Sequence, residues 1–144
     1  MAEQASDRLI MRATPEQCLA VVTDFERYPE WAADVKAVTV DERDDQGRAV
    51  EVSFRAGAFG RSTSYTLRYD YAKAPEELSW VLVNGDITSK LDGAYHFDPS
   101  GDDTEVVYHL VAELKMPLPG FIKRRAEARI MTTALRNLKA RVES

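Results

Sequence analysis

The strongest constraint in the sequence is an alternation of apolar and polar residues that runs from about Val50 to Leu114, divided into short segments by turn residues. A period of two is typical of β-strands that bury one face and expose the other. The alternation therefore predicts a meander of five antiparallel strands with one apolar face.

Two turns predict how these strands pair. Asn84-Gly85 is the strongest short-turn signal in the chain and predicts the tip of one hairpin. The cross-strand pairs that it implies are Leu82 with Ile87, Trp80 with Ser89, and Leu78 with Leu91. A turn over residues 98–103 predicts the next hairpin. Its pairs are Phe97 with Thr104, Tyr95 with Val106, and Gly93 with Tyr108. The first hairpin, around residues 44–47, leaves two registers open.

This pairing separates charged from uncharged side chains. The inner face carries no Asp, Glu, Lys, Arg or His over the five strands, and its polar groups are hydroxyls. Those hydroxyls belong to Thr63, Tyr65, Tyr69, Tyr71, Ser89, Tyr95, Thr104 and Tyr108. The outer face carries Glu51, Arg55, Arg68, Asp70, Lys90, Asp92, His96, His109 and Glu113. Hydroxyls orient an apolar ligand by a few hydrogen bonds, but tyrosine titrates near 10 and is a poor acid or base at neutral pH.

The last stretch of the chain, from Pro117 to Val142, predicts a long amphipathic helix. After a turn that ends at Gly120 it contains no proline or glycine. Its apolar side consists of Met131, Ala134, Leu135, Leu138 and Val142, and its polar side of Arg125, Arg129, Thr132, Arg136 and Lys139. A one-sided antiparallel sheet with a long helix on its apolar face is an α+β fold.

Two charged residues of this helix, Arg124 and Glu127, share the direction of Met131 on the helical wheel. One interpretation is that this end of the helix overhangs the sheet and that both charges reach water along their stems. The other is that they stand at the mouth of a cavity, as a polar gate or an anchor for a ligand head group.

A second apolar strip on the helix, Ile122, Ala126 and Ile130, lies off the main stripe. Together with Phe59 on its glycine-flanked hairpin, this strip would close over a pocket, contact a partner or pack on the strand ends. The sequence leaves these three alternatives open.

The N-terminal part predicts a loose segment to Asp7, a strand at residues 8–12 and two short helices. Thr14-Pro15-Glu16-Gln17 has the pattern of a capping box with proline at the first helical position. Cys18, Leu19, Val21 and Val22 form the buried side of this helix. Residues 25–31 predict a second short helix, broken at Pro29, whose three aromatic residues either plug the sheet or form one wall of a cavity.

Length and charge narrow the class of protein. A chain of 144 residues is expected to form one domain, residues 1–144. The net charge of −5 argues against nucleic acid as the main partner. The single cysteine, Cys18, fits a reducing cytoplasm. No signal peptide and no membrane-spanning segment is expected, because no apolar run approaches the required length.

Patterns for cofactor, metal or nucleophilic chemistry are weak. His96 and His109 fall on the outer face, opposite Glu105 and Asp92, as solvated cross-strand pairs. Neither histidine has a third ligand at zinc-site spacing, no serine follows a nucleophile-elbow pattern, and no glycine-rich phosphate loop is present. We therefore expect no metal, no cofactor and no catalytic triad.

Several motifs resemble the polyketide cyclase/dehydrase and lipid-transport family of the START-like, or Bet v 1-like, superfamily. They are Thr14-Pro15-Glu16 after a first strand, FERYPEW at residues 25–31, LDGAYHF at residues 91–97, and Pro117-Leu118-Pro119-Gly120 before a final helix. The resemblance covers essentially the whole chain. It implies a helix-grip fold, with a curved seven-stranded antiparallel sheet wrapped around the C-terminal helix and two small helices after the first strand.

Members of this family usually enclose a cavity for lipids, sterols, quinones or polyketides between sheet and helix. The resemblance and the charge-free inner face together predict a carrier or sensor for an apolar or aromatic small molecule. We expect its ligand to be bound by Phe54, Tyr65, Tyr69, Trp80, Tyr95, Tyr108, Arg124, Glu127 and Met131. The alternatives are a polyketide aromatase/cyclase or dehydrase, and a protein-interaction module with a filled core. The expected oligomeric state is a monomer or a weak homodimer.

Overall fold

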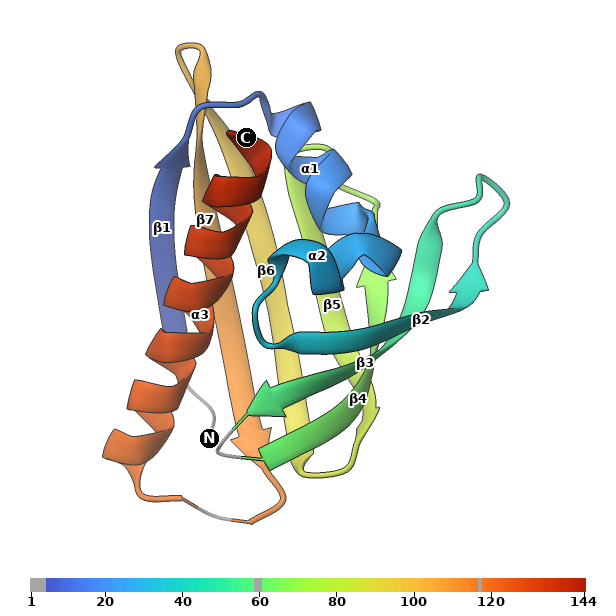
Figure 1. Cartoon of the computed structure of the whole chain (residues 1–144), viewed down its shortest axis with the longest axis vertical. Coiled ribbons are helices and arrows are strands. Elements are labelled where there is room, and N and C mark those ends of the chain that lie inside the picture. Colours follow the sequence, from blue (N-terminus) through green and yellow to red (C-terminus); the bar gives the residue numbers. More distant parts are fainter. Residues whose placement is uncertain (1–4, 59–60, 117) are drawn as a thin grey trace.

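Seven strands are present in the part of the chain that the computed structural model describes, residues 5–58, 61–116 and 118–144. They are β1 (Ala5–Met11), β2 (Val35–Arg43), β3 (Ala49–Ala58), β4 (Arg61–Asp70), β5 (Glu77–Gly85), β6 (Thr88–Ser100) and β7 (Asp103–Leu114). All neighbouring strands are antiparallel and form one sheet in the order β1-β7-β6-β5-β4-β3-β2. The sheet curves around a long C-terminal helix (Figure 1), which confirms the predicted helix-grip fold.

The helices are α1 (Pro15–Thr23), the 3-10 turn η1 (Phe25–Arg27), α2 (Tyr28–Trp31) and α3 (Gly120–Val142). The capping box that opens α1 is confirmed, because the Gln17 amide donates to Thr14 Oγ1 and the Thr14 amide donates to Gln17 Oε1. We expected Pro29 to break a helix, but it does not. It lies in the first turn of α2, where a missing N–H leaves no hydrogen bond unmade.

The first strand begins earlier than the sequence suggested. Residues 5–7, which we expected to be loose, form the start of β1 and pair with β7, with Ala5 opposite Leu110. Asp7 also accepts a hydrogen bond from the Thr132 hydroxyl of α3 at 3.1 Å. Pairing with β7 and the hydrogen bond to α3 therefore keep residues 5–7 ordered, although their composition is polar.

The hairpin between β5 and β6 is paired four residues away from the predicted register. Leu78 lies opposite Tyr95 instead of Leu91. Asn84-Gly85 is not the tip, because both residues continue β5 and pair with β4. Beyond Trp80 the two strands no longer pair directly, and the Leu82 amide instead donates to the Asp92 carboxylate at 2.9 Å.

The hairpin between β6 and β7 differs from the prediction by two residues. Phe97 lies opposite Val106 instead of Thr104, and the strands continue until Ser100 faces Asp103. The turn is therefore tighter than expected, and Gly101 supplies the positive φ of +63° that it requires.

Both register errors are even, so they leave almost every side chain on its predicted face. Phe54, Leu67, Tyr69, Tyr95 and Tyr108 all point inward and are buried, as expected. The exception lies at the start of β6, where the pairing with β7 shifts between Thr88 and Lys90. Thr88 is consequently buried, and Ser89, which we expected to point inward, is exposed.

The first hairpin resolves the register that the sequence left open. Val40 lies opposite Val52 and Arg43 opposite Ala49, with irregularities on either side of Glu42. In Figure 1 this end of the sheet curls away from α3.

Helix α3 buries its predicted apolar stripe. Met131, Leu135 and Leu138 are at most 3% exposed. The helix packs mainly against β1 and β7 at one side of the sheet (Figure 1), and it has fewer contacts with the strands further along. This placement leaves room over β3 to β6. Among the described residues, no helix is long and apolar enough to cross a membrane.

Gly93 provides the closest packing inside the sheet. A Cβ atom at this position would lie 2.6 Å from the His109 carbonyl oxygen and 2.6 Å from Cζ2 of Trp80. The Trp80 indole therefore lies directly over the backbone of its cross-strand partner. Only glycine leaves enough space for it.

We expect Gly93→Ala to lower the free energy of unfolding by about 2 to 3 kcal/mol, because the added methyl group overpacks against both backbone and indole. Chemical denaturation followed by tryptophan fluorescence measures the change. Gly57→Ala is the matched control, since a Cβ there meets nothing within 4 Å. Equal stability of the two variants would contradict this packing argument.

Candidate functional site

A cavity of about 170 Å³ lies between the concave face of the sheet, α2 and α3. Strands β3 to β7 contribute Phe54, Ala56, Gly57, Thr63, Tyr65, Leu67, Tyr69, Trp80, Thr88, Leu91, Tyr95 and Tyr108. Helix α2 and the loop after it contribute Tyr28, Trp31, Ala32, Ala33 and Asp34, β2 contributes Val35, and α3 contributes Ile130, Thr133, Ala134 and Asn137. Apolar and aromatic side chains dominate this lining.

Trp80 occupies the centre of the aromatic part of the lining. Its ring centroid lies 5.7 Å from that of Tyr69, 5.4 Å from Tyr95 and 5.7 Å from Tyr108. Tilted and edge-to-face arrangements at these distances are favourable for aromatic pairs. The cluster joins the four neighbouring strands β4, β5, β6 and β7 and forms the floor of the cavity.

Six of the nine predicted ligand-binding residues line this cavity: Phe54, Tyr65, Tyr69, Trp80, Tyr95 and Tyr108. The structure does not bring the other three to it. Met131 is buried in the core between α3 and the sheet, and Arg124 is exposed. Glu127 lies near the end of β7, beside a separate hollow. A ligand-binding role for any of the nine remains a prediction.

Glu127 is buried, although Arg124 reaches water as one of our two interpretations expected. The Glu127 carboxylate accepts hydrogen bonds from the Ala112 amide at 3.2 Å and from Lys123 Nζ at 3.0 Å. The Ala112 amide lies beyond Leu110, which is the last residue of β7 with a described partner in β1. The carboxylate satisfies this amide, which gives Glu127 a structural role at the edge of the sheet.

Helix α3 contributes Ile130, Thr133, Ala134 and Asn137 to the cavity, at the helical spacing of three and four residues. The sequence singled out Ile130 in the second apolar strip and Ala134 in the main stripe, but not Thr133 and Asn137. That spacing was the available signal. The second apolar strip is divided: Ile130 lines the cavity and Ile122 is exposed, while Phe59 lies outside the described residues.

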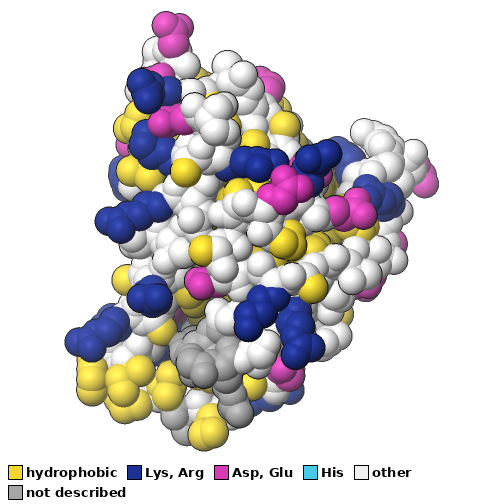
Figure 2. Space-filling model, in the orientation of Figure 1, with side chains coloured by type: hydrophobic (Ala, Val, Ile, Leu, Met, Phe, Trp, Pro, Cys, Tyr) yellow, Lys and Arg dark blue, Asp and Glu magenta, His cyan; other side chains and the backbone are white. Residues whose placement is uncertain are grey.

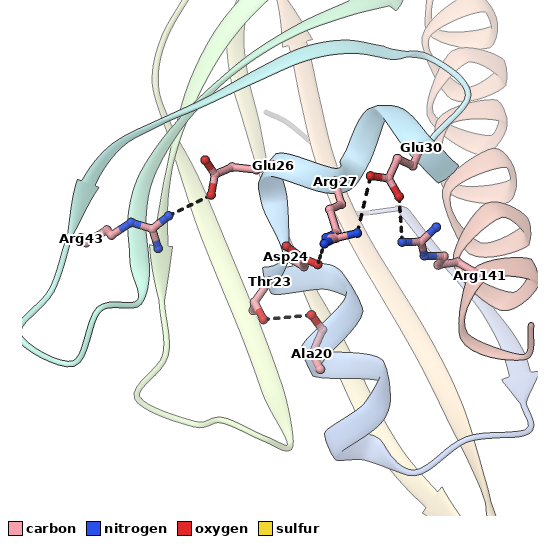
Figure 3. Close-up of polar contacts among 8 residues, drawn as sticks. All are labelled: Ala20, Thr23, Asp24, Glu26, Arg27, Glu30, Arg43 and Arg141. Atoms are coloured by element: carbon pink, nitrogen blue, oxygen red, sulfur yellow. Dashed lines mark hydrogen bonds and ion pairs between the residues drawn. The ribbon is translucent and has the colours of Figure 1, made fainter.

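Helix α2 forms one wall of the cavity through Tyr28 and Trp31, as one interpretation of the FERYPEW segment expected. Ion pairs connect α2 and the preceding turn η1 to their neighbours (Figure 3): Glu30 of α2 contacts Arg141 of α3, and Glu26 of η1 contacts Arg43 of β2, each at 3.1 Å. Exposed pairs of this kind contribute little to stability. The Tyr28 hydroxyl adds an internal hydrogen bond of 2.5 Å to the Val22 carbonyl.

Two classes of tyrosine hydroxyl are present in this interior. Tyr28 and Tyr71 donate to backbone carbonyls, the latter to Ala49 at 2.6 Å. Within the described residues, the hydroxyls of Tyr69, Tyr95 and Tyr108 have no protein partner, although each side chain lines the cavity and is less than a tenth exposed. Their oxygen atoms are not among the fully buried polar atoms of the described residues, so these three groups open onto the cavity and are available to a ligand.

Other polar groups at the cavity are satisfied or sealed. Thr63 donates to the Asp86 carboxylate at 2.5 Å, which places an acidic group at the edge of the lining. Thr88 Oγ1 is fully buried and lacks a partner in the described part of the chain. The inner strands alone predicted that hydroxyls would be the only polar groups of the lining. Asp34 and Asn137, which lie outside these strands, add a carboxylate and an amide to it.

All six tyrosines have a raised pKa. Burial raises the pKa of Tyr65 to about 12, with the Asp34 charge adding to the effect, and burial raises that of Tyr71 to about 12. Burial also raises the pKa of Tyr69, Tyr95 and Tyr108 well above 10. These groups are therefore neutral hydrogen-bond donors at physiological pH.

The two histidines lie on the outer face as expected, but the register shift gives them other partners. His96 Nε2 is 3.2 Å from Glu77 instead of facing Glu105. His109 Nδ1 shares a 2.7 Å hydrogen bond with Ser6 instead of facing Asp92. Among the described residues, no group of three His, Cys, Asp or Glu side chains is arranged to hold a metal ion.

Cys18 is buried in α1, as predicted. Burial raises the pKa of its thiol to about 11, an effect that a hydrogen bond with Thr104 opposes in part. The thiol is therefore protonated and a poor nucleophile at neutral pH.

We expect a spectrophotometric titration at 295 nm to show no tyrosinate in the native protein near pH 10. Because the folded-state pKa values exceed the unfolded ones, the resulting stability is complete below pH 10 and is lost as pH rises above it. Ionisation of the tyrosines should coincide with loss of the circular dichroism signal. The protein in guanidinium chloride is the control and should titrate near pH 10. A sixth of the total amplitude near pH 10 in the native protein would contradict this.

Comparison with solved structures shows the same fold in several proteins. A START superfamily protein from Mycobacterium smegmatis is 25% identical, with 97% of each chain covered and a TM-score of 0.92. The ZhuI aromatase/cyclase from Streptomyces sp. R1128 is 12% identical, with 99% of this chain and 94% of that chain covered and a TM-score of 0.85. A STAR-related lipid transfer protein from Xanthomonas axonopodis is 14% identical, with 98% and 86% covered and a TM-score of 0.72.

A search of curated proteins finds no match. The model of the family described as polyketide cyclase / dehydrase and lipid transport matches residues 1–143. Family and fold together fit a role in hydrophobic ligand binding, polyketide cyclisation or lipid transport. The chain therefore belongs to the polyketide cyclase/dehydrase and lipid-transport family.

Proposed function

We propose that the protein is a carrier or sensor that binds a small apolar or aromatic molecule in the cavity between sheet and α3. The observation that carries this proposal is the lining: an aromatic floor in which the hydroxyls of Tyr69, Tyr95 and Tyr108 have no partner among the described residues and border the available space. Apolar pockets with a few convergent polar groups are typical small-molecule sites.

The size of the cavity indicates the size of the ligand. A dry cavity of about 150 Å³ is large enough for benzene, and this one measures about 170 Å³. One or two aromatic rings fit without rearrangement of the walls. A larger lipid, sterol or polyketide requires α2 to move outward, and the exposed ion pairs at Glu30 and Glu26 offer little resistance to such a movement.

The cavity chemistry supports binding more than catalysis. General acid–base catalysis at neutral pH needs a group whose pKa lies near 7, and burial moves the pKa of every tyrosine in the lining away from that value. The enzyme alternative is an aromatase/cyclase or dehydrase in which tyrosines, Arg124 and Glu127 handle protons, but neither Arg124 nor Glu127 belongs to the lining of the cavity. Unchanged turnover of a genuine substrate after Arg124→Ala and Glu127→Ala would remove their proposed catalytic role.

A bound aromatic ligand should change the intrinsic fluorescence of both tryptophans, because Trp31 and Trp80 are the two tryptophans of the chain and both line the cavity. We expect 1-naphthol to quench this fluorescence with a micromolar midpoint. Trp31→Phe and Trp80→Phe should each retain part of the response. Glucose at the same concentration is the control. A signal that does not respond to naphthol, naphthalene, quinones or fatty acids would refute the binding proposal.

Removal of one of these tyrosine hydroxyls should selectively weaken the binding of a ligand that carries a hydroxyl group. We expect Tyr95→Phe to lower the affinity for 1-naphthol by about fivefold, since one neutral hydrogen bond is lost, and to leave the affinity for naphthalene unchanged. Its stability should not decrease, because the hydroxyl has no partner among the described residues. Fluorescence titration and chemical denaturation measure the two effects.

Tyr71→Phe is the matched control for this experiment. Its hydroxyl bonds to the Ala49 carbonyl and lies outside the cavity lining, so the variant should lose about 1 kcal/mol of stability and keep its naphthol affinity. Equal losses of affinity in both variants would show that the hydroxyls act through the fold and not on the ligand. The cytoplasmic location, the monomeric or weakly dimeric state and the absence of a nucleic-acid partner remain predictions.

A further inference from the structure

Exposed apolar side chains gather at the start of α3 and in the turn before it. Met116 is 68% exposed, Leu118 36%, Phe121 61% and Ile122 40%. We call these four residues the apolar tip. Figure 2 shows hydrophobic side chains protruding at the lower left, at the end of the molecule where α3 begins in Figure 1. Exposed apolar side chains that are contiguous in this way mark an interaction surface.

The apolar tip lies within a basic segment. From Lys115 to Ala126 the sequence contains four lysines and arginines and no acidic residue, whereas the whole chain has a net charge of −5. Arg124 and Arg125 are exposed on the first turns of α3, and within the described residues neither forms an ion pair. Their charges are therefore available to an acidic surface, opposite in sign to the rest of the protein.

The combination of apolar and basic side chains indicates the class of partner. Protruding Phe, Ile and Leu side chains beside Arg and Lys are typical of segments that lie in the interface of an anionic bilayer. Contact of the apolar tip with the same surface of a second copy would instead bring positive charges together. Beside the tip lies a hollow of about 260 Å³, whose lining combines apolar residues such as Met116, Leu118 and Ala126 with the charged residues Glu113, Lys123 and Glu127.

We propose that the apolar tip docks the protein on anionic lipid bilayers. Phe121 and Ile122 enter the interface, and Arg124 and Arg125 contact the lipid head groups. Neither pair belongs to the lining of the ligand cavity. The docking surface is therefore independent of the ligand that the cavity binds.

Flotation with lipid vesicles tests this proposal. The full-length protein should bind vesicles of phosphatidylcholine with about one third phosphatidylglycerol, and should bind pure phosphatidylcholine vesicles at least about tenfold more weakly, with the difference disappearing at high salt. Phe121→Ser combined with Ile122→Ser should lower vesicle affinity by about tenfold or more, because two apolar side chains no longer enter the interface. Arg124→Gln combined with Arg125→Gln should remove most of the preference for anionic lipid.

The chain offers matched controls. Val81 and Val83 are 52% and 48% exposed on the outer face of β5, so their replacement by serine changes apolar exposure elsewhere and should leave vesicle binding unaltered. Arg55→Gln removes an exposed charge from the outer face of β3. All variants should retain naphthol quenching, which separates loss of docking from loss of ligand binding.

Three outcomes would overturn the proposal. One is wild-type protein that does not bind anionic vesicles, and another is a Phe121/Ile122 double variant that binds them as well as the Val81/Val83 control. The third is a dimer in analytical ultracentrifugation that the tip variants convert to a monomer, which would identify the tip as a protein interface.

Discussion

The contact between Trp80 and Gly93 is the constraint on which the rest of the interior depends. The indole lies over a strand position that has no side chain, close enough that a Cβ atom would collide with it. From there the ring reaches tyrosines on both sides, Tyr69 on β4 and Tyr95 and Tyr108 on β6 and β7. One missing side chain therefore allows an aromatic layer to extend across the curved sheet and to form the floor of a cavity.

The period of two explains why the sequence predicted the faces of the sheet and failed on its registers. Leu78 faces Tyr95 instead of Leu91, and Phe97 faces Val106 instead of Thr104, yet each error is even and keeps the side chains on the same face. The inner aromatic residues could therefore be found without the correct hairpins. Only the local irregularity at Thr88 exchanged inner for outer residues, and no pattern in the sequence marks it.

The helical wheel gave the buried stripe of α3 but not the surroundings of each position. It placed Arg124, Glu127 and Met131 on the same side of the helix. In the structure Arg124 is exposed to water, Glu127 is buried beside the end of β7, and Met131 lies in the core. The role of Glu127 depends on how α3 lies along β7, because its carboxylate accepts a hydrogen bond from the Ala112 amide of that strand. The cavity likewise depends on α3 packing against β1 and β7, and such a placement is a tertiary property that periodicity does not encode.

The choice of tyrosine over phenylalanine in the aromatic floor is itself an argument about function. For packing alone, Tyr69, Tyr95 and Tyr108 gain nothing from their hydroxyls, which have no protein partner in the described part of the chain. Among the described residues, Thr88 Oγ1 is the fully buried side-chain polar atom without a partner, so the three tyrosine oxygens open onto the cavity instead of being sealed in the core. Tyr28 and Tyr71 in the same interior do have backbone acceptors. Groups that a fold leaves unpaired beside an apolar cavity are accounted for when a ligand with its own polar atoms completes them.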